Sequence, residues 1–256
     1  MANIVFERKI YDKMLAWKQE RQGKTALLIK GARRIGKSTI VRTFAGREYK
    51  SYILIDFSMA SKAVTDLFED LMNLDFIFLR LQSIYQVVLE KRKSVIIFDE
   101  VQLCPKARQA IKHLVADGRY DYIETGSLIS IKKNVANIII PSEETRLEMY
   151  PMDFEEFCWA LGLKDKMEYM RQDLQQNNLF KDELTDAFWQ YMVVGGMPRA
   201  VVEWLDSKNM AAVDEVLTGI LHSYRNDFSK HTDPLQAERM NLIWQSIPAQ
   251  FAKEHR

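Results

Sequence analysis

Short apolar runs alternate with longer amphipathic stretches over the first 150 residues of the chain. The runs at residues 25–30, 52–56, 94–98 and 122–125 are largely apolar and are flanked by glycine or polar residues. Runs of this length and composition are typical of buried strands. The stretches between them carry apolar residues every three or four positions, as amphipathic helices do. Strands and helices that alternate in this way predict an α/β sheet with mostly parallel strands.

The same pattern places the remaining elements of this region. We expect helices at 13–22, after residue 36 with its stop at Gly46, at 71–88, and at 107–115 with its stop at Gly118, and further strands at 137–140 and 147–150.

From Pro151 onward the pattern predicts helices only, with apolar stripes such as the one from Met210 to Tyr224. The change marks a domain boundary. We therefore divide the chain into residues 1–150, 151–233 and 234–256. The segment Gly195-Gly-Met-Pro198 is the clearest turn in the helical half.

A glycine-rich motif directly follows the first predicted strand. It fits the pattern G-x-x-x-x-G-K-[ST] and consists of Gly31, Ala32, Arg33, Arg34, Ile35, Gly36, Lys37 and Ser38, followed by Thr39. Between a strand and a helix, such a loop surrounds a β-phosphate with backbone N–H groups at a helix N-terminus. Lys37 would reach the β- and γ-phosphate oxygens, and Ser38 would ligate Mg²⁺. The motif predicts a P-loop, and the lack of N-K-x-D favours ATP over GTP.

Two adjacent carboxylates, Asp99 and Glu100, follow the apolar strand at 94–98. Open α/β sheets bind ligands at the carboxyl ends of their strands. We expect Asp99 to hold Mg²⁺ through water and Glu100 to polarise the attacking water, the arrangement of a Walker B motif. We also expect the P-loop strand and the Asp99 strand to be adjacent in the sheet.

The next strand ends in Thr125-Gly-Ser127. It lies beside the Asp99 strand if the sheet is ordered as in P-loop ATPases. A hydroxyl here would contact the γ-phosphate or the water, as a sensor 1 residue does, and we prefer Ser127 to Thr125. The alternative is a turn that caps the following helix.

Phosphoryl transfer usually needs one more positive charge at the γ-phosphate, from an arginine in the same chain or in a neighbour. Arg146 follows the last apolar strand and is the preferred candidate. Arg199, Arg33 and Arg34 are the alternatives. An arginine from a neighbour would require a homo-oligomer.

The composition argues against several classes of protein. The 36 basic and 35 acidic residues give a net charge of +1, which does not favour a general binder of nucleic acid or anionic membranes. Cys104 and Cys158 lack the companions of a zinc site or a disulfide framework. No apolar run reaches the roughly 20 residues that cross a bilayer, and no secretory signal is visible at the start. We therefore expect a cytoplasmic protein without membrane partners.

Together these motifs resemble those of prokaryotic AAA+ ATPases of the AAA_14 type, which are usually fused to a C-terminal DUF4143 region. The P-loop, Ile97-Phe-Asp-Glu-Val-Gln102 and Glu124-Thr-Gly-Ser-Leu128 are similar to the family's Walker A, Walker B and sensor 1 segments. Residues 146–157 are similar to its arginine and lid helix, and 195–199 to its glycine-proline turn.

The resemblance implies a P-loop NTPase (ASCE/AAA+) three-layer sandwich at 1–150 and an all-α lid at 151–233. It implies the start of a further helical or winged-helix element at 234–256. A DUF4143 effector region should follow, so we expect the chain to be a fragment that lacks its effector.

Three functions agree with these features. The first is an ATPase that hydrolyses ATP to ADP and phosphate with Mg²⁺ and switches core, lid and effector. The second is an ATP-binding signalling switch with little or no turnover. The third is a nucleic-acid-associated module that uses the C-terminal helices and Lys132-Lys133, which the near-neutral charge disfavours.

Overall fold

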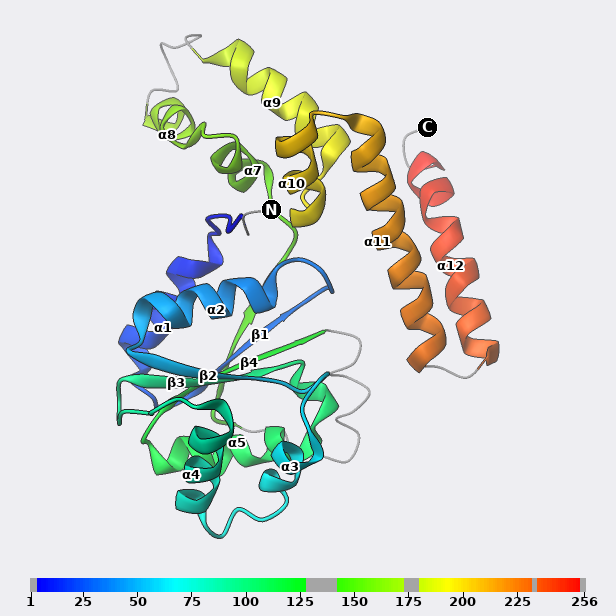
Figure 1. Ribbon diagram of the computed structural model, residues 1–256. Helices are drawn as coiled ribbons and strands as arrows, with labels where there is room; N and C mark the ends of the chain where they lie inside the picture. Colours follow the sequence, from blue (N-terminus) through cyan, green and yellow to red (C-terminus); the bar gives the residue numbers. More distant parts are fainter. Residues whose placement is uncertain (1–3, 128–141, 173–179, 232–233, 254–256) are drawn as a thin grey trace. The chain divides into compact units, whose positions relative to one another are not determined.

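The computed structural model describes residues 4–127, 142–172, 180–231 and 234–253, and Figure 1 shows the course of the chain. In chain order the elements are α1 (Ile10–Arg21), β1 (Ala26–Gly31), α2 (Lys37–Glu48), β2 (Ser51–Asp56), α3 (Lys62–Thr65), η1 (Asp66–Phe68), α4 (Leu74–Tyr85), β3 (Ser94–Asp99), η2 (Val101–Leu103), α5 (Pro105–Asp117), β4 (Asp121–Ser127), β5 (Glu144–Glu148), α7 (Phe154–Ala160), α8 (Lys164–Gln172), α9 (Lys181–Val194), α10 (Pro198–Ser207), α11 (Met210–His231) and α12 (Pro234–Lys253).

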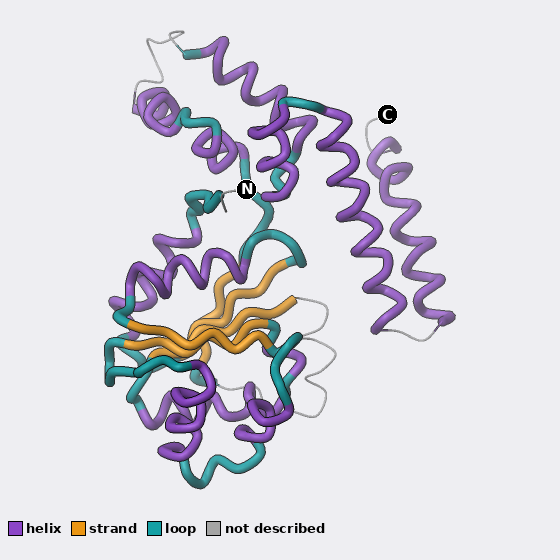
Figure 2. Tube along the Cα trace, viewed as in Figure 1, coloured by secondary structure: helices purple, strands orange, loops and turns teal. Residues whose placement is uncertain are grey.

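In the described part of the chain, five strands form one sheet in the order β2-β3-β4-β1-β5, and all neighbouring strands are parallel (Figure 2). Every residue of β3 and β4 is buried. Strands with a partner on both sides and a helical layer on both faces lose contact with water completely, which explains their apolar runs. The predicted parallel α/β sheet is confirmed.

Helices cover both faces of this sheet, which gives the three layers that the resemblance implies. On one face α1 and α2 pack against β1, β3 and β4 through a core that includes Met14, Trp17 and Phe44. On the other face α3, α4 and α5 pack against the strands through a core that includes Phe68 and Phe98. The carboxyl ends of the strands therefore meet at one edge between the two helical layers.

One expectation about the sheet is wrong. The P-loop strand β1 does not pair with β3, which ends in Asp99; β4 lies between them and pairs with both. The hydrophobic pattern shows that a strand is buried, but it does not show which strands lie beside it. The expected neighbourhood of β4 and β3 is confirmed.

Two helix boundaries also differ from the prediction. Gly46 does not end α2, which continues to Glu48. The helix expected at 71–88 covers only Leu74–Tyr85, because Gln86 takes a left-handed conformation with φ 54° and turns the chain. Val88, the last member of the predicted apolar stripe, is 78% exposed. The strand expected at 137–140 lies outside the described residues.

The chain divides into two compact units, of which the first ends at Pro198 and the second begins at Arg199. In the first unit, a capping box formed by Asp153 and Glu156 begins α7. Gly196 lies so close to the backbone of Met152 that a Cβ would be 1.9 Å from its carbonyl oxygen. The Gly195-Gly-Met-Pro198 turn therefore packs directly against the segment that leads into α7.

The described residues of the second unit form helices joined by short connections. In it α11 and α12 pack side by side, with the rings of Tyr224 and Trp244 6.2 Å apart. Residues 234–253 form one helix. The divisions after residues 150 and 233 remain predictions from the sequence.

Candidate nucleotide-binding site

The glycine-rich motif connects the end of β1 at Gly31 with the start of α2 at Lys37 (Figure 1). Gly31 has no room for a side chain, because a Cβ there would lie 2.3 Å from the carbonyl oxygen of Met149 and 2.6 Å from Cδ1 of Ile35. Gly36 has φ +94°, a conformation that only glycine adopts at little cost. The two glycines thus meet different demands, close backbone approach at one and positive φ at the other.

The other side chains of the loop differ in their exposure to solvent. Ile35 is fully buried in the core beneath α2 and anchors the loop. The side chains of Arg33, Arg34 and Thr39 are exposed, and Arg34 has φ 64°. A cationic, solvent-facing loop on a fixed base suits an anionic ligand.

Lys37 is 5% exposed, and its ammonium group has backbone partners inside the loop. Nζ donates to the carbonyl oxygens of Gly31 at 3.1 Å and Ala32 at 2.7 Å. Burial lowers the pKa of Lys37, while the carboxylates of Glu100 and Asp99 act in the opposite direction. A phosphate at this loop would bring a further negative charge to the buried ammonium.

Ser38 and Asp99 meet across the site. The Ser38 hydroxyl donates to Oδ1 of Asp99 at 2.9 Å, which joins the first turn of α2 to the end of β3. Asp99 is 4% exposed. A hydroxyl and a carboxylate are the oxygen ligands that Mg²⁺ prefers, and two of them at one point beside a phosphate-binding loop fit this ion.

Glu100 has a strained backbone next to this pair. It takes φ 54° and ψ 44°, a left-handed conformation that is uncommon for residues with a side chain. The side-chain amide of Gln102 donates to its carboxylate oxygen Oε2. Gln102 thus holds the Glu100 carboxylate at this turn.

Thr125, on the strand between β1 and β3, binds both acidic residues. Its hydroxyl donates to Oδ1 of Asp99 and accepts from the N–H of Glu100 at 3.2 Å. Ser127, the residue that we preferred from the sequence, ends β4 in register with Gly31. Both hydroxyls thus lie on the central strand, and Thr125 makes hydrogen bonds to both acidic residues.

The structure does not bring Arg146 to this group of residues. Arg146 lies on the edge strand β5 in register with Leu28, three residues before the end of β1, and its Nε pairs with Oε2 of Glu144 at 3.2 Å. Its side chain is 47% exposed. Arg199 begins the second compact unit and is not placed relative to the site. For both residues, the role of arginine finger remains a prediction.

Sequence reasoning missed two residues beside the motif. Gln102 looks like any polar turn residue, although its partner is Glu100. Arg8 stands in a charged N-terminal segment that suggests solvent exposure, yet it is 6% exposed and donates to the carbonyl oxygen of Ile35 in the P-loop at 3.0 Å. The only signal that local sequence offers for Arg8 is its place shortly before helix α1.

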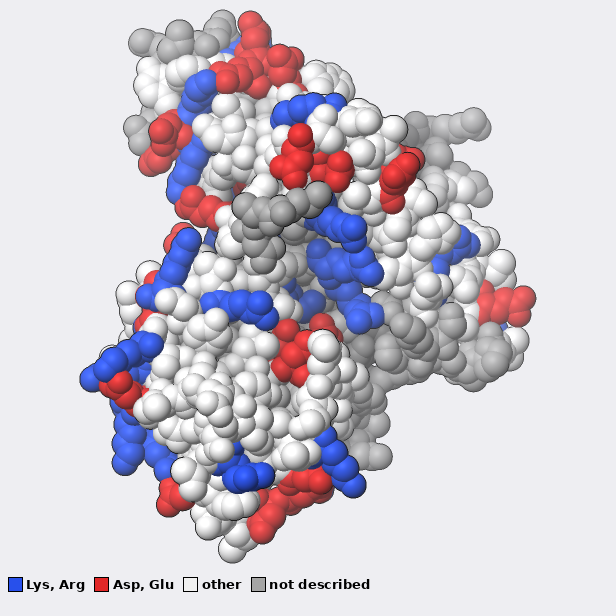
Figure 3. All heavy atoms as spheres, viewed as in Figure 1, with Lys and Arg blue, Asp and Glu red and all other residues white. Residues whose placement is uncertain are grey.

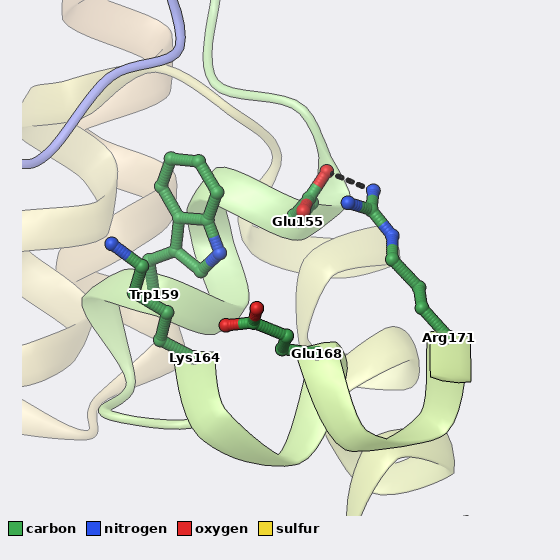
Figure 4. A pocket seen from close by; sticks show the side chains of 5 residues that line it. All are labelled: Glu155, Trp159, Lys164, Glu168 and Arg171. Carbon is green, nitrogen blue, oxygen red and sulfur yellow. Dashed lines mark hydrogen bonds and ion pairs between the residues drawn. The ribbon is translucent and has the colours of Figure 1, made fainter. Parts of the chain in front are cut away.

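A separate hollow of about 340 Å³ lies between α7 and α8 (Figure 4). Its lining consists of Glu155, Trp159, Lys164, Glu168 and Arg171. Figure 4 shows the Arg171 guanidinium at the Glu155 carboxylate. The Nη2 atom of Arg171 lies 2.5 Å from Oε2 of Glu155. These residues belong to the helices after the sheet, so the hollow is not formed by the residues of the motif.

On the face of the α/β core seen in Figure 3, basic side chains are interspersed with acidic ones. The residues Lys132-Lys133, which we considered for nucleic-acid contact, lie outside the described part of the chain. Among the described helices, none combines the length and the apolar character that crossing a membrane requires.

Comparison with known proteins gives matches to two families. Residues 23–158, more than half of the chain, match AAA_14, an AAA domain. Residues 185–255 match a domain of unknown function, DUF8612. The match in the C-terminal part is thus to a different family from DUF4143, which the resemblance led us to expect. No curated protein matches the chain.

Solved structures similar to the chain include three proteins of low sequence identity. PCH-2 of C. elegans is 12% identical, with 84% of this chain and 70% of that chain covered and a TM-score of 0.45. The Thermotoga maritima RuvB Holliday junction branch migration motor is 14% identical, with 83% and 69% covered and a TM-score of 0.46. The Aeropyrum pernix ORC1 protein, solved in complex with DNA, is 13% identical, with 89% and 68% covered and a TM-score of 0.44.

Proposed function

Since the chain belongs to the AAA_14 family of AAA domains, we propose that it binds ATP with Mg²⁺ at residues 31–39 and hydrolyses it to ADP and phosphate. The observation that carries the proposal is one connected set of hydrogen bonds. Ser38 of the P-loop donates to Asp99, and Thr125 links Asp99 to Glu100. These hydrogen bonds support one site that joins the phosphate-binding loop, the proposed metal ligand Asp99 and the backbone of the proposed base Glu100.

Each residue has a role that follows from its position. The N–H groups of the loop would surround the β-phosphate, and Lys37 would turn from its backbone carbonyls to the β- and γ-phosphate oxygens. Ser38 would hold Mg²⁺ directly and Asp99 through water. Bound Mg²⁺ neutralises charge on the β- and γ-phosphate oxygens.

Hydrolysis needs a base that is close to the γ-phosphate but not bound to the metal. Glu100 follows Asp99 directly, and its carboxylate accepts from Gln102, whereas the Asp99 carboxylate accepts from Ser38 and Thr125. It would orient a water molecule and accept its proton as the water oxygen bonds to the γ-phosphorus. The bond from the γ-phosphorus to the β–γ bridging oxygen breaks, and ADP leaves with that electron pair.

The source of an additional positive charge remains part of the proposal. In this structure Arg146 pairs with Glu144 on the edge strand, so it would act on a neighbouring copy rather than on its own site. Such an arrangement makes ATPase activity depend on a homo-oligomer. A C-terminal effector, of the DUF4143 or the DUF8612 type, would be the part that hydrolysis moves.

Calorimetric titration with ATP and Mg²⁺ tests the binding step. Wild type should bind ATP more tightly than GTP, and Lys37→Ala should weaken ATP binding by at least about tenfold. Lys24→Ala is the matched control, because Lys24 is an exposed lysine before β1. Equal affinities of wild type and Lys37→Ala would remove the proposed site. Binding without phosphate release would instead indicate an ATP-dependent switch.

A further inference from the structure

Arg8 joins three parts of the first unit through one buried guanidinium group. Nη1 donates to the carbonyl oxygen of Ile35 at 3.0 Å, and Nη2 donates to the carbonyl oxygen of Tyr150 at 2.7 Å. Nε lies 3.0 Å from Oε2 of Glu156. The three partners belong to the P-loop, to the segment between β5 and α7, and to the first turn of α7.

Lys9 continues the connection to α7. Its N–H donates to Oε1 of Glu156 at 2.7 Å, and its Nζ lies 2.6 Å from Asp153 and 2.5 Å from Glu155. Asp153 and Glu156 are also the residues of the capping box that begins α7. We call Arg8 and Lys9 the N-terminal clamp. It holds the carboxylates on which the start of α7 depends.

The contact with Ile35 bears directly on phosphate binding. The peptide unit between Ile35 and Gly36 is planar and trans, so its carbonyl group and its N–H group point in opposite directions. When Arg8 fixes the carbonyl oxygen of Ile35, it also fixes the direction of the Gly36 N–H. The N–H groups of such a loop are the donors that surround the phosphates.

We infer that Arg8 is a positioning residue that couples the P-loop to helix α7, so that nucleotide binding and the seating of α7 stabilise each other. This inference rests on the proposed binding of ATP. Because the coupling is a free energy between two sites, it acts in both directions: α7 held by Glu156 favours the binding-competent loop, and a filled loop favours the seated helix. If Arg8 only stabilised the fold, nucleotide binding would not change the stability of α7.

Hydrogen exchange measured by mass spectrometry distinguishes a coupling role of Arg8 from a purely structural one. The protein is compared with and without a non-hydrolysable ATP analogue and Mg²⁺, in wild type, Arg8→Lys, Glu156→Gln and Arg108→Lys. The Arg8→Lys variant keeps the charge but loses the fork that reaches three partners at once. Arg108 is the matched control: it is 3% exposed and paired with Glu144, away from the motif.

In wild type and Arg108→Lys, the analogue should slow exchange both at residues 31–39 and at residues 154–160. In Arg8→Lys and Glu156→Gln, it should slow exchange at 31–39 only, with affinity for the analogue reduced by about tenfold. Equal slowing of α7 in Arg8→Lys and wild type would overturn the inference, as would a wild-type α7 that does not respond while the P-loop does. If the analogue does not slow exchange at residues 31–39 in wild type, the proposed ATP binding itself is contradicted.

Discussion

The hydroxyl of Thr125 donates a hydrogen bond to Oδ1 of Asp99 and accepts one from the N–H of Glu100. One side chain on the central strand thus orients both acidic residues of the candidate site. Thr125→Val keeps the shape but removes both bonds, and we expect it to lower kcat for ATP hydrolysis by about 10- to 100-fold, the usual effect of losing a residue that orients metal ligands.

Thr125→Ser is the control for this prediction, because it keeps the hydroxyl and should retain most of the activity. Ser127→Ala tests our earlier preference and should have a smaller effect on kcat than Thr125→Val. If Thr125→Val had the same kcat as wild type, the hydrogen bonds of Thr125 to Asp99 and Glu100 would not be needed for ATP hydrolysis.

Lys37 carries a charge that burial disfavours in the absence of nucleotide, as its lowered pKa indicates. We expect Lys37→Met to leave the free energy of unfolding without nucleotide within about 1 kcal/mol of wild type, because the lost hydrogen bonds to backbone carbonyls are offset by the relief of desolvation. Saturating ATP with Mg²⁺ should raise Tm in wild type and not in the variant. A variant destabilised by several kcal/mol would mean that Lys37 holds the empty loop together.

Gly31 and Gly46 form a matched pair of glycine-to-alanine changes. A Cβ at Gly31 would lie 2.3 Å from the carbonyl oxygen of Met149, whereas one at Gly46, inside α2, would be 4.0 Å from the nearest atom, in Tyr52. Gly31→Ala should displace the P-loop and weaken ATP binding by at least about tenfold. Gly46→Ala should instead stabilise the protein by about 0.5–1 kcal/mol. Thermal unfolding and ATP titration of both variants check the contrast; unchanged ATP affinity in Gly31→Ala would contradict it.

The sequence predicted the elements of the site better than their arrangement. The strand before Gly31 and the strand before Asp99 are short apolar runs, and the P-loop is a local motif, so each can be found from a few neighbouring residues. The order of strands depends on pairing between distant segments. For this reason the place of β4 between β1 and β3, and with it the contact from Thr125 to Asp99, came only from the structure.

Arg8 shows a second limit of sequence reasoning. Its neighbours Glu7 and Lys9 are charged, and nothing in their spacing separates it from a solvated arginine. Its burial depends on acceptors that lie 27 and 142 residues away along the chain, at Ile35 and Tyr150. Two of its three partners are backbone carbonyls, and contacts with backbone carbonyls leave no pattern in the partners' side chains.

Glu124 and Glu144 lie near each other but differ in their partners. Within the described part of the chain, both carboxylate oxygens of Glu124 are buried without a hydrogen-bond partner, while Glu144 pairs with Arg108 at 3.1 Å. Burial, together with the nearby charge of Glu144, raises the pKa of Glu124 well above its usual range. The folded protein therefore keeps a proton on Glu124 that the unfolded chain releases above about pH 4.

This difference lowers stability as pH rises, by up to about 1.4 kcal/mol per pH unit for one proton. Glu124→Gln removes the dependence, so the variant should exceed wild type in free energy of unfolding by a margin that grows from pH 5 to pH 8. Glu144→Gln should lose about 3 kcal/mol at pH 5, since Arg108 loses this partner, and should depend less on pH than wild type, because the charge that helps to raise the pKa of Glu124 is gone. Urea denaturation at the two pH values measures both; a Glu124→Gln margin that is constant or shrinks with pH would contradict the assignment.

The most direct test of the account is phosphate release from ATP and Mg²⁺ by wild type and by Glu100→Gln, measured together with ATP affinity. Glu100→Gln should bind ATP within about twofold of wild type and release phosphate at least about 100-fold more slowly, because only the base that accepts the proton of water is lost. Equal rates of phosphate release in the two proteins would show that Glu100 is not the catalytic base.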